Sequence, residues 1–450
     1  MSDHPVYEPP RPARHVGRLP LTELLARARR SLLEVWNEGA FRNEVVNTKV
    51  LHQRIFVFNM PAAIEAVFVT QLAGFERKLP QLRHTLEPLL GDGLLISDGP
   101  VWKARRPPVQ AVTHASRMAG LTPEMTRTAV EWRADWSARP DGTPIDALEE
   151  MDRFTAGLLG RTIFGSALTS EAAAELSAAF ALYEARVGRT DLISMLGLTD
   201  FLPRIRGFGS RGEVRRIHGV VDRLIGVILD GKAGETSLVA AMAGAPGMTR
   251  GALRNEAVSL FVAGHQTMAN TLAWAWFLLS EAPWAEAALH AELDAVLGGR
   301  DPAFEDLPEL PYTRAVIEET LRLYPPLPLL ARRAPEDTEV TGIDVPQGSI
   351  VMVSPWIVHR HERHWEAPDE FRPERFLPDA PPPAPYTYLP FSLGPRICTG
   401  QHFGLQAAMI CLATLGARFR LRGVAGQRAF PTYRLTLRPG ESLPMILERR

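Results

Sequence analysis

The residues best suited to chemistry lie near the C-terminal end of the chain, in a loop rich in glycine and proline. Cys398 stands in this loop, and residues 401–417 after it have the apolar pattern of a helix. Unpaired amides and the helix dipole at a helix N-terminus lower the pKa of a thiol and favour the thiolate. A thiolate is a metal ligand. The alternative for a single cysteine is a structural residue in a surface turn.

The neighbours of Cys398 suit haem iron as the metal. Gly394 permits a sharp turn, and Gly400 lets the backbone approach a flat macrocycle closely. Arg396, two residues before the cysteine, can pair with a haem propionate through charge-assisted hydrogen bonds. Phe391 can shield the sulfur from water. So many matched positions in one short loop favour haem over the structural reading.

The pattern Phe-x-x-Gly-x-Arg-x-Cys-x-Gly at 391–400 resembles the cysteine loop of the cytochrome P450 haem-thiolate monooxygenases. The resemblance implies that Cys398 is the axial iron ligand, whose electron donation favours O–O cleavage. It also implies a mainly α fold with small β-sheets (α+β), in which haem b lies between a long central helix and the helix after the cysteine loop. Length alone suggests two or three domains; the resemblance implies a single haem domain over 1–450.

A long helix is predicted over residues 250–280, and it carries the segment 263–267. The small residues Ala263 and Gly264 leave room against a flat cofactor. Thr267 can hydrogen-bond a carbonyl one turn back, which loosens the helix and opens a groove. The resemblance places O2 in this groove and gives these residues catalytic roles. Taken alone, the segment reads as a buried helix with a few satisfied polar groups.

Gln266 stands where the family usually has an acid that helps to pass protons to dioxygen. Glutamine cannot titrate, but it can hold water by donating and accepting hydrogen bonds. His265 could substitute, although adjacent helix residues point about 100° apart. This departure keeps open atypical chemistry such as peroxide-driven oxidation, oxidative coupling or dehydration.

Three residues outside the cysteine loop are implied propionate anchors. Trp102 and Arg106 lie four apart and share a helix face, although such a pair alone is more often a stacked surface pair. Arg332, favoured over Arg333 by its spacing to Asp337, is the third.

Glu319 and Arg322 also share a helix face, and alone they would form a solvated salt bridge. The resemblance implies instead a buried structural network, joined by Arg375, that holds the cysteine loop. Leu329 and Leu330, by family position, are candidate substrate-pocket residues.

Composition excludes several other functions. Net charge is −1, so there is no basic excess to suggest nucleic acid. The two cysteines indicate neither a disulfide framework nor a zinc site, and a reducing cytoplasm fits; Cys411 is predicted to be a core residue. Three nearby histidines, His359, His361 and His364, could ligate zinc, but they lack a defined spacing and we expect no metal there.

Residues 1–20 read as an extended, Pro-rich segment without a signal peptide or membrane anchor. The apolar run 257–279 is long enough to span a bilayer, but its polar residues favour a buried helix. The other expected elements are a helix over 21–36, two strands within 45–58, a helix over 62–69, a long loop over 75–100, helices from 123 to 244 broken at 207–212 and 231–234, a substrate lid near 192–203, a hairpin over 339–353 and short strands within 414–450, such as 433–437.

The predicted function is insertion of one oxygen atom from O2 into a hydrophobic small molecule. The sequence names no substrate. The chain contains no flavin, nicotinamide or iron-sulfur segment after the cysteine loop, so electrons are expected from NAD(P)H through a ferredoxin and its reductase, with the protein a monomer. The expected docking face comprises Arg105, Arg117, Arg418 and Arg420. A non-catalytic haem sensor or carrier is the second alternative, and Thr267 argues against it.

Overall fold

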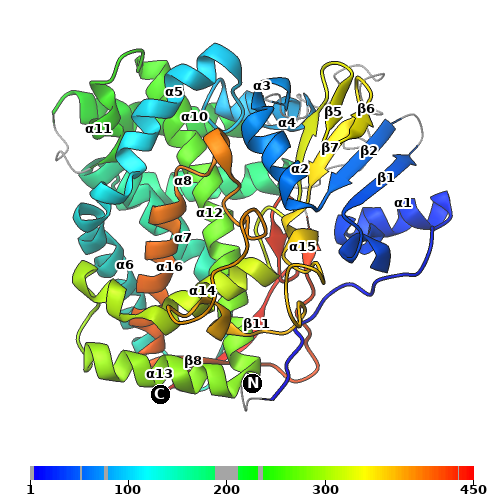
Figure 1. The fold of residues 1–450 in the computed structure, drawn as a ribbon. Helices are drawn as coiled ribbons and strands as arrows, with labels where there is room; N and C mark the ends of the chain where they lie inside the picture. The colour runs from blue at the N-terminus through cyan, green and yellow to red at the C-terminus, as the bar shows by residue number, and fades with distance from the viewer. Residues whose placement is uncertain (1–4, 51–52, 76–79, 188–210, 232–236, 434) are drawn as a thin grey trace.

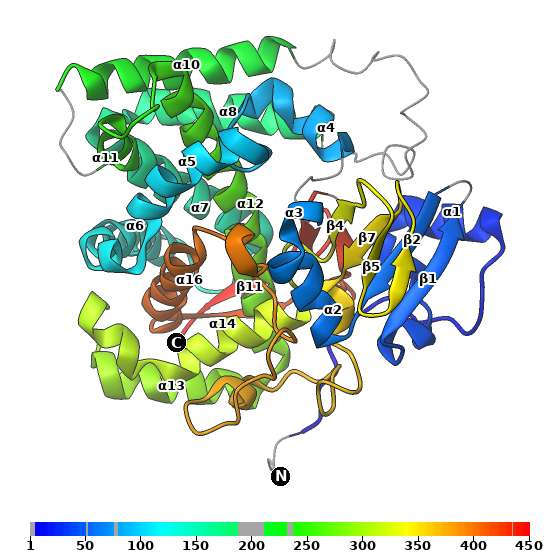
Figure 2. The ribbon, with the colours of Figure 1, turned by 45° about the horizontal axis from the view of Figure 1, so that its top comes forward.

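A computed structural model describes residues 5–50, 53–75, 80–187, 211–231, 237–433 and 435–450 (Figure 1). Helices form the larger part, and a small sheet region built from β1, β2, β5 and β7 lies to one side of them, next to α1 (Figure 2). This arrangement agrees with the predicted mainly α fold with small sheets. None of the described helices is both long enough and apolar enough to cross a membrane.

The described helices are α1 (Leu21–Arg30), α2 (Pro61–Glu65), α3 (Leu72–Phe75), α4 (Pro80–Leu90), α5 (Gly99–Thr113), α6 (Met118–Ala138), α7 (Ala147–Phe164), α8 (Ser170–Val187), α10 (Arg211–Leu229), α11 (Leu238–Ala243), α12 (Arg250–Glu281), α13 (Pro283–Leu297), α14 (Pro311–Leu323), α15 (Pro355–Val358) and α16 (Gln401–Gly416). The long helix α12 packs directly against α7, α14 and α16.

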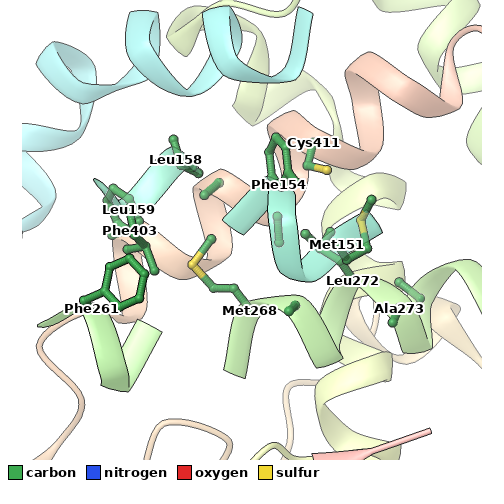
Figure 3. Packing of buried hydrophobic residues seen from close by; sticks show 14 of the residues in the cluster. Met151, Phe154, Leu158, Leu159, Phe261, Met268, Leu272, Ala273, Phe403 and Cys411 are labelled. Atoms are coloured by element: carbon green, nitrogen blue, oxygen red, sulfur yellow. The ribbon is translucent and has the colours of Figure 1, made fainter. Parts of the chain in front are cut away.

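The core between α7, α12 and α16 is apolar (Figure 3). Phe154 and Leu158 of α7 lie close to Met268 of α12, and all three are buried. Cys411 of α16 is fully buried in the same cluster, as predicted for a core residue. Burial on several sides fixes α12 and α16 relative to each other, and these are the helices that carry the two main sequence motifs.

The largest sheet has the strand order β1 (Val45–Val50), β2 (Gln53–Phe58), β7 (Ile350–Val353), β4 (Leu330–Arg333). β2 and β7 run parallel, and the other two pairs are antiparallel. A second sheet joins β3 (Thr143–Asp146), β11 (Pro444–Arg449) and β8 (Phe419–Gly423). The remaining strand pairs are β5 (Thr338–Val340) with β6 (Ile343–Val345), and β9 (Thr432–Tyr433) with β10 (Leu437–Arg438).

Most predicted elements are present, and five predictions need correction. The hairpin predicted over 339–353 ends at Val345, because β5 pairs with β6 and β7 joins the largest sheet. The predicted loop over 75–100 contains α4 and the start of α5, because Leu86, Leu89 and Leu90 pack into the core and outweigh the proline content. The helix predicted over 21–36 ends at Arg30 and is followed by a separate 3-10 turn, Leu32–Val35.

The segment 433–437 holds parts of two short strands instead of one, and β3 interrupts the predicted helical region. The predicted lid at 192–203 lies outside the described residues, as do most of the predicted breaks at 207–212 and 231–234.

Candidate haem-thiolate site

The cysteine loop closes on itself just before α16. The Cys398 amide donates to the Phe391 carbonyl at 2.9 Å. Gly394 has φ +65°, and a Cβ built there would lie 2.4 Å from the carbonyl oxygen of Phe68. Only glycine fits this turn, which holds the loop against the helical segment that contains Phe68.

The thiol of Cys398 does not behave as the sequence suggested. Burial raises its pKa, and the Gly400 amide and the Arg106 guanidinium oppose this rise without reversing it. The prediction of a lowered thiol pKa is therefore wrong for the protein alone. The residue still has accessible surface. The raised pKa and the accessible surface agree if the sulfur lines a recess that is surrounded by protein and open on one side. Coordination to a metal would deprotonate such a thiol.

Arginines gather beside this thiol. The Arg396 guanidinium stacks 4.0 Å from the centroid of the Trp102 ring, and it donates to Asp98 Oδ1 at 3.1 Å and to the Ser97 carbonyl at 2.9 Å. Burial and the repulsion of Arg396 lower the pKa of Arg332 to about 10. The same two effects lower the pKa of Arg106. The nearby Cys398 sulfur acts in the opposite direction and raises it.

These contacts show that Trp102, Arg106, Arg332 and Arg396 meet in one region. Asp98, which the sequence reading missed, is the one carboxylate that raises the pKa of Arg332 there. Arg332 Nε is buried and has no hydrogen-bond partner among the described residues. Such a surplus of buried cations fits a dianionic group, as the two propionates of haem would provide.

Strand geometry decides between the two arginines of β4. Arg332 pairs with Val351 of β7 and Arg333 with Ile350, and neighbouring residues on a strand point to opposite faces. Arg332 is buried near Arg396, whereas Arg333 is only half-buried. Arg332 is thus the arginine that reaches the site.

A short part of α12 remains accessible in the middle of an otherwise buried helix. Ala263 is exposed, and Gln266 and Thr267 are half-buried. These positions, three and four residues apart, lie on one face of the helix. The Thr267 hydroxyl donates to the Ala263 carbonyl at 2.8 Å and approaches the Gly264 carbonyl at 3.2 Å, as the sequence suggested.

His265 faces the opposite way, toward α7, and Gly264 lies at the edge of the accessible face. A Cβ on Gly264 would lie 3.1 Å from two methyl carbons of Leu159, so this glycine permits close packing of α12 against α7. His265 is buried, and its Nε2 lies 3.0 Å from the Asp152 carbonyl oxygen. The helical rotation therefore rules out the substitution of His265 for the missing acid.

The predicted structural network is complete and buried. Arg322 donates to Glu319 through Nε at 2.6 Å and through Nη2 at 2.7 Å, and both side chains are 0% exposed. Arg375 lies 3.6 Å from the same carboxylate, and the Arg372 amide donates to it at 2.8 Å.

His359 connects this network to the cysteine loop. Its Nε2 accepts from the Leu389 amide at 2.7 Å, so Nδ1 carries the proton and donates to the Arg322 carbonyl at 3.1 Å. Burial lowers the pKa of His359 to about 3, which keeps the ring neutral.

The other two histidines of the candidate zinc group bond different backbone carbonyls: the ring of His361 bonds that of Asn43, and the ring of His364 bonds that of Asn59. No group of three or more potential ligands that could hold a metal ion occurs in the described residues.

The two candidate substrate-pocket residues lie in different surroundings. Leu329 packs against the large core cluster and Leu330 against the small cluster around the main sheet. Leu327, the first residue of the apolar segment 327–330, is 43% exposed between two prolines just after α14.

The predicted docking face is also not a single surface. Arg105 points inward, with a side chain 13% exposed that pairs with Asp92 at 3.2 Å. Arg418 and Arg420 follow the C-terminal end of α16, about 24 Å along that helix from Cys398. Arg117 is exposed, and its neighbour Met118 contacts Gln406 in the middle of α16.

Comparison with known proteins defines the class. The Cytochrome P450 family profile matches residues 9–439. Cyclooctatin synthase from Streptomyces melanosporofaciens is 36% identical over 82% of this chain and 81% of its own length. Cyclooctat-9-en-7-ol 5-monooxygenase from the same organism is 32% identical over 80% of this chain and 79% of its own length. The solved heme domain of cytochrome P450DA superposes with a TM-score of 0.80 at 20% identity, covering 99% of this chain and 98% of that one.

The fold and the cysteine loop are thus those of a haem-thiolate enzyme. The chain belongs to the cytochrome P450 family, and it is a cytochrome P450 monooxygenase. The family implies haem, O2 and reducing electrons from partner proteins. The residues present fit haem, because a single accessible cysteine, a cluster of buried arginines and an accessible face of α12 occur together.

Proposed function

We propose that the protein is a single haem domain that oxidises a terpenoid. Three of its relatives are named for hydrocarbon-rich compounds: cyclooctat-9-en-7-ol 5-monooxygenase, carotene epsilon-monooxygenase and pentalenene oxygenase. An apolar substrate also suits the accessible Ala263, which offers a methyl group to a ligand.

In this proposal Cys398 ligates the iron, while Trp102, Arg106, Arg332 and Arg396 hold the propionates. The observation that carries the assignment is the arginine cluster: half-buried Arg106 beside the accessible cysteine, and the buried Arg332 and Arg396 near it. Gly394 and Phe391 shape the loop around the sulfur, and Gly400 keeps the backbone beside it small. Haem supplies the activation of O2, from which one oxygen atom enters the substrate.

The residues of α12 would leave room for O2 and substrate and would hold the water molecules that deliver protons. Ala263 leaves room for O2 and substrate beside the accessible face. Thr267 commits its hydroxyl proton to the helix carbonyls, so its oxygen is free to accept a hydrogen bond from water. Gln266 can hold a second water by donating to it. Together they would guide protons without a titrating acid.

Electrons would come from NAD(P)H through a ferredoxin and its reductase. Among the predicted docking residues, Arg117 keeps an exposed side chain and lies beside the middle of α16. We expect Arg117→Glu to slow reduction of the iron by an acidic ferredoxin, with Arg418→Glu, at the far end of α16, as the matched control. Equal reduction rates in both variants would remove this docking site.

The test of the proposed function is an optical titration of the ferric protein with terpene hydrocarbons, terpene alcohols, fatty acids and steroids. We expect a terpenoid to shift the spin state and to be oxidised when a ferredoxin, its reductase and NAD(P)H are supplied. Turnover with peroxide alone would favour the atypical-chemistry alternative. Haem binding with no turnover of any compound would favour a sensor or carrier.

A further inference from the structure

The accessible face of α12 ends at a side-chain contact from a distant part of the sequence. Asn270 continues the stripe of Ala263, Gln266 and Thr267 by one turn, but it is only 3% exposed. Its Nδ2 donates to Oγ1 of Thr436 at 3.0 Å. Thr436 Oγ1 in turn donates to Oε1 of Gln266 at 3.3 Å. A residue near the C-terminus therefore links two α12 side chains.

The direction of these hydrogen bonds follows from the groups involved. The Asn270 amide nitrogen can only donate, so it occupies a lone pair of the Thr436 oxygen. The hydroxyl of Thr436 has one proton, and that proton goes to the carbonyl oxygen of Gln266. The amide orientation of Gln266 is thereby fixed, and its Nε2 hydrogens are left to donate elsewhere.

The backbone at Thr436 is held in place through the residue that follows it. The next residue, Leu437, donates its amide to the Pro326 carbonyl at 2.9 Å, and it begins β10, which pairs with β9. Thr436 is 7% exposed. Because its backbone is anchored to the turn after α14, its hydroxyl is presented to α12 from a fixed position.

We propose that Thr436 is a positioning residue that orients the amide of Gln266, with Asn270 setting the direction of the Thr436 hydroxyl. This inference rests on the proposed function of the same site. Gln266 then offers a donor to water and Thr267 an acceptor, side by side on the accessible face of α12. An oriented amide then takes the place of a titrating acid. The fraction of consumed electrons that ends in product should therefore not change with pH in the way that the titration of a carboxyl group would cause.

The first test compares Thr436→Val with Thr436→Ser in the haem-loaded protein. Valine keeps the shape and removes the hydroxyl, whereas serine retains it. Losing one hydrogen bond of about 0.5–1.5 kcal/mol should raise uncoupled electron consumption roughly two- to tenfold in the valine variant, and serine should restore coupling. Thr432→Val is the matched control, because the Thr432 hydroxyl donates to the Phe430 carbonyl in its own segment and, among the described residues, makes no hydrogen bond to α12.

The second readout needs no turnover. The infrared stretching frequency of carbon monoxide bound to the reduced haem responds to hydrogen-bond donors near the iron. We expect Thr436→Val and Gln266→Leu to shift this frequency in the same direction, and the double variant to match Gln266→Leu alone. Asn270→Leu provides the same comparison if Thr436→Val does not fold.

A Thr436→Val protein with wild-type coupling and wild-type frequency would overturn the inference. Additive shifts in the double variant would also overturn it, because Thr436 would then act independently of Gln266. If the wild-type protein oxidises no terpenoid, the proposed function fails, and the frequency comparison still decides the role of Thr436.

Discussion

Replacing Glu319 by alanine should release the haem by loosening the cysteine loop. The carboxylate accepts two hydrogen bonds from Arg322, at 2.6 and 2.7 Å, and one from the Arg372 amide at 2.8 Å. Alanine would leave the Arg322 charge buried and unpaired, which costs about 3–5 kcal/mol. Loss of the acceptor for the Arg372 amide costs about 1–3 kcal/mol, and the two terms overlap. We therefore expect a loss of about 4 kcal/mol in the free energy of unfolding.

The effect should reach Cys398 through His359. Arg322 donates to the His359 carbonyl at 2.8 Å, and the His359 ring accepts from the Leu389 amide at 2.7 Å. Leu389 lies just before the cysteine loop. A displaced Arg322 removes the support for this ring, so the loop loses its fixed position and haem affinity falls.

The assay measures urea unfolding by circular dichroism and haem content by absorbance. Glu318→Ala is the matched control, because Glu318 is on the same helix and its carboxylate pairs with Arg314 near the surface, at 2.9 Å. That variant should change the free energy of unfolding by less than about 1 kcal/mol and keep its haem. Equal stability and equal haem content in the two variants would refute the reasoning.

Three further changes have defined outcomes. Gly394→Ala should prevent haem binding because its Cβ would clash 2.4 Å from a carbonyl, whereas Gly298→Ala, also at positive φ but with open space around it, should retain haem; equal retention would remove the steric argument. Burial raises the pKa of Glu256 to about 7 from 4.5, so its contribution to stability is lost as pH rises toward and through 7. Between pH 5 and 8 the wild type should lose about 2 kcal/mol of unfolding free energy more than Glu256→Gln, and parallel urea-unfolding profiles would contradict this. Thr267→Ala should increase NAD(P)H oxidation per product formed, and unchanged coupling would show that Thr267 does not guide protons.

Local patterns were sufficient to predict the elements that carry the site. Apolar periodicity and the positions of glycine and proline located α12 and α16 to within one residue, because a long apolar stretch without an internal proline is typical of a buried helix. The cysteine loop could be predicted for the same reason: Gly394 and Cys398 act within one short turn.

What the sequence could not give is the neighbour that each side chain meets. Spacing showed that Gly264 and Thr267 belong to one helix segment, but only packing shows that Gly264 faces Leu159. Arg105 looked like a surface charge, and it is paired inside the fold. Thr436 carries no motif, since its role depends on a contact across more than one hundred and sixty residues.

The most direct test of the account is the absorption spectrum of the reduced, carbon monoxide-bound protein, recorded for the wild type and for Cys398→Ser. We predict that the wild type shows the Soret position of thiolate-ligated haem, and that the variant loses it. Cys411→Ser, which changes the other, buried cysteine, should keep the thiolate spectrum. A wild-type spectrum of a haem with a nitrogen ligand, or one that persists in Cys398→Ser, would contradict the assignment of Cys398 as the iron ligand.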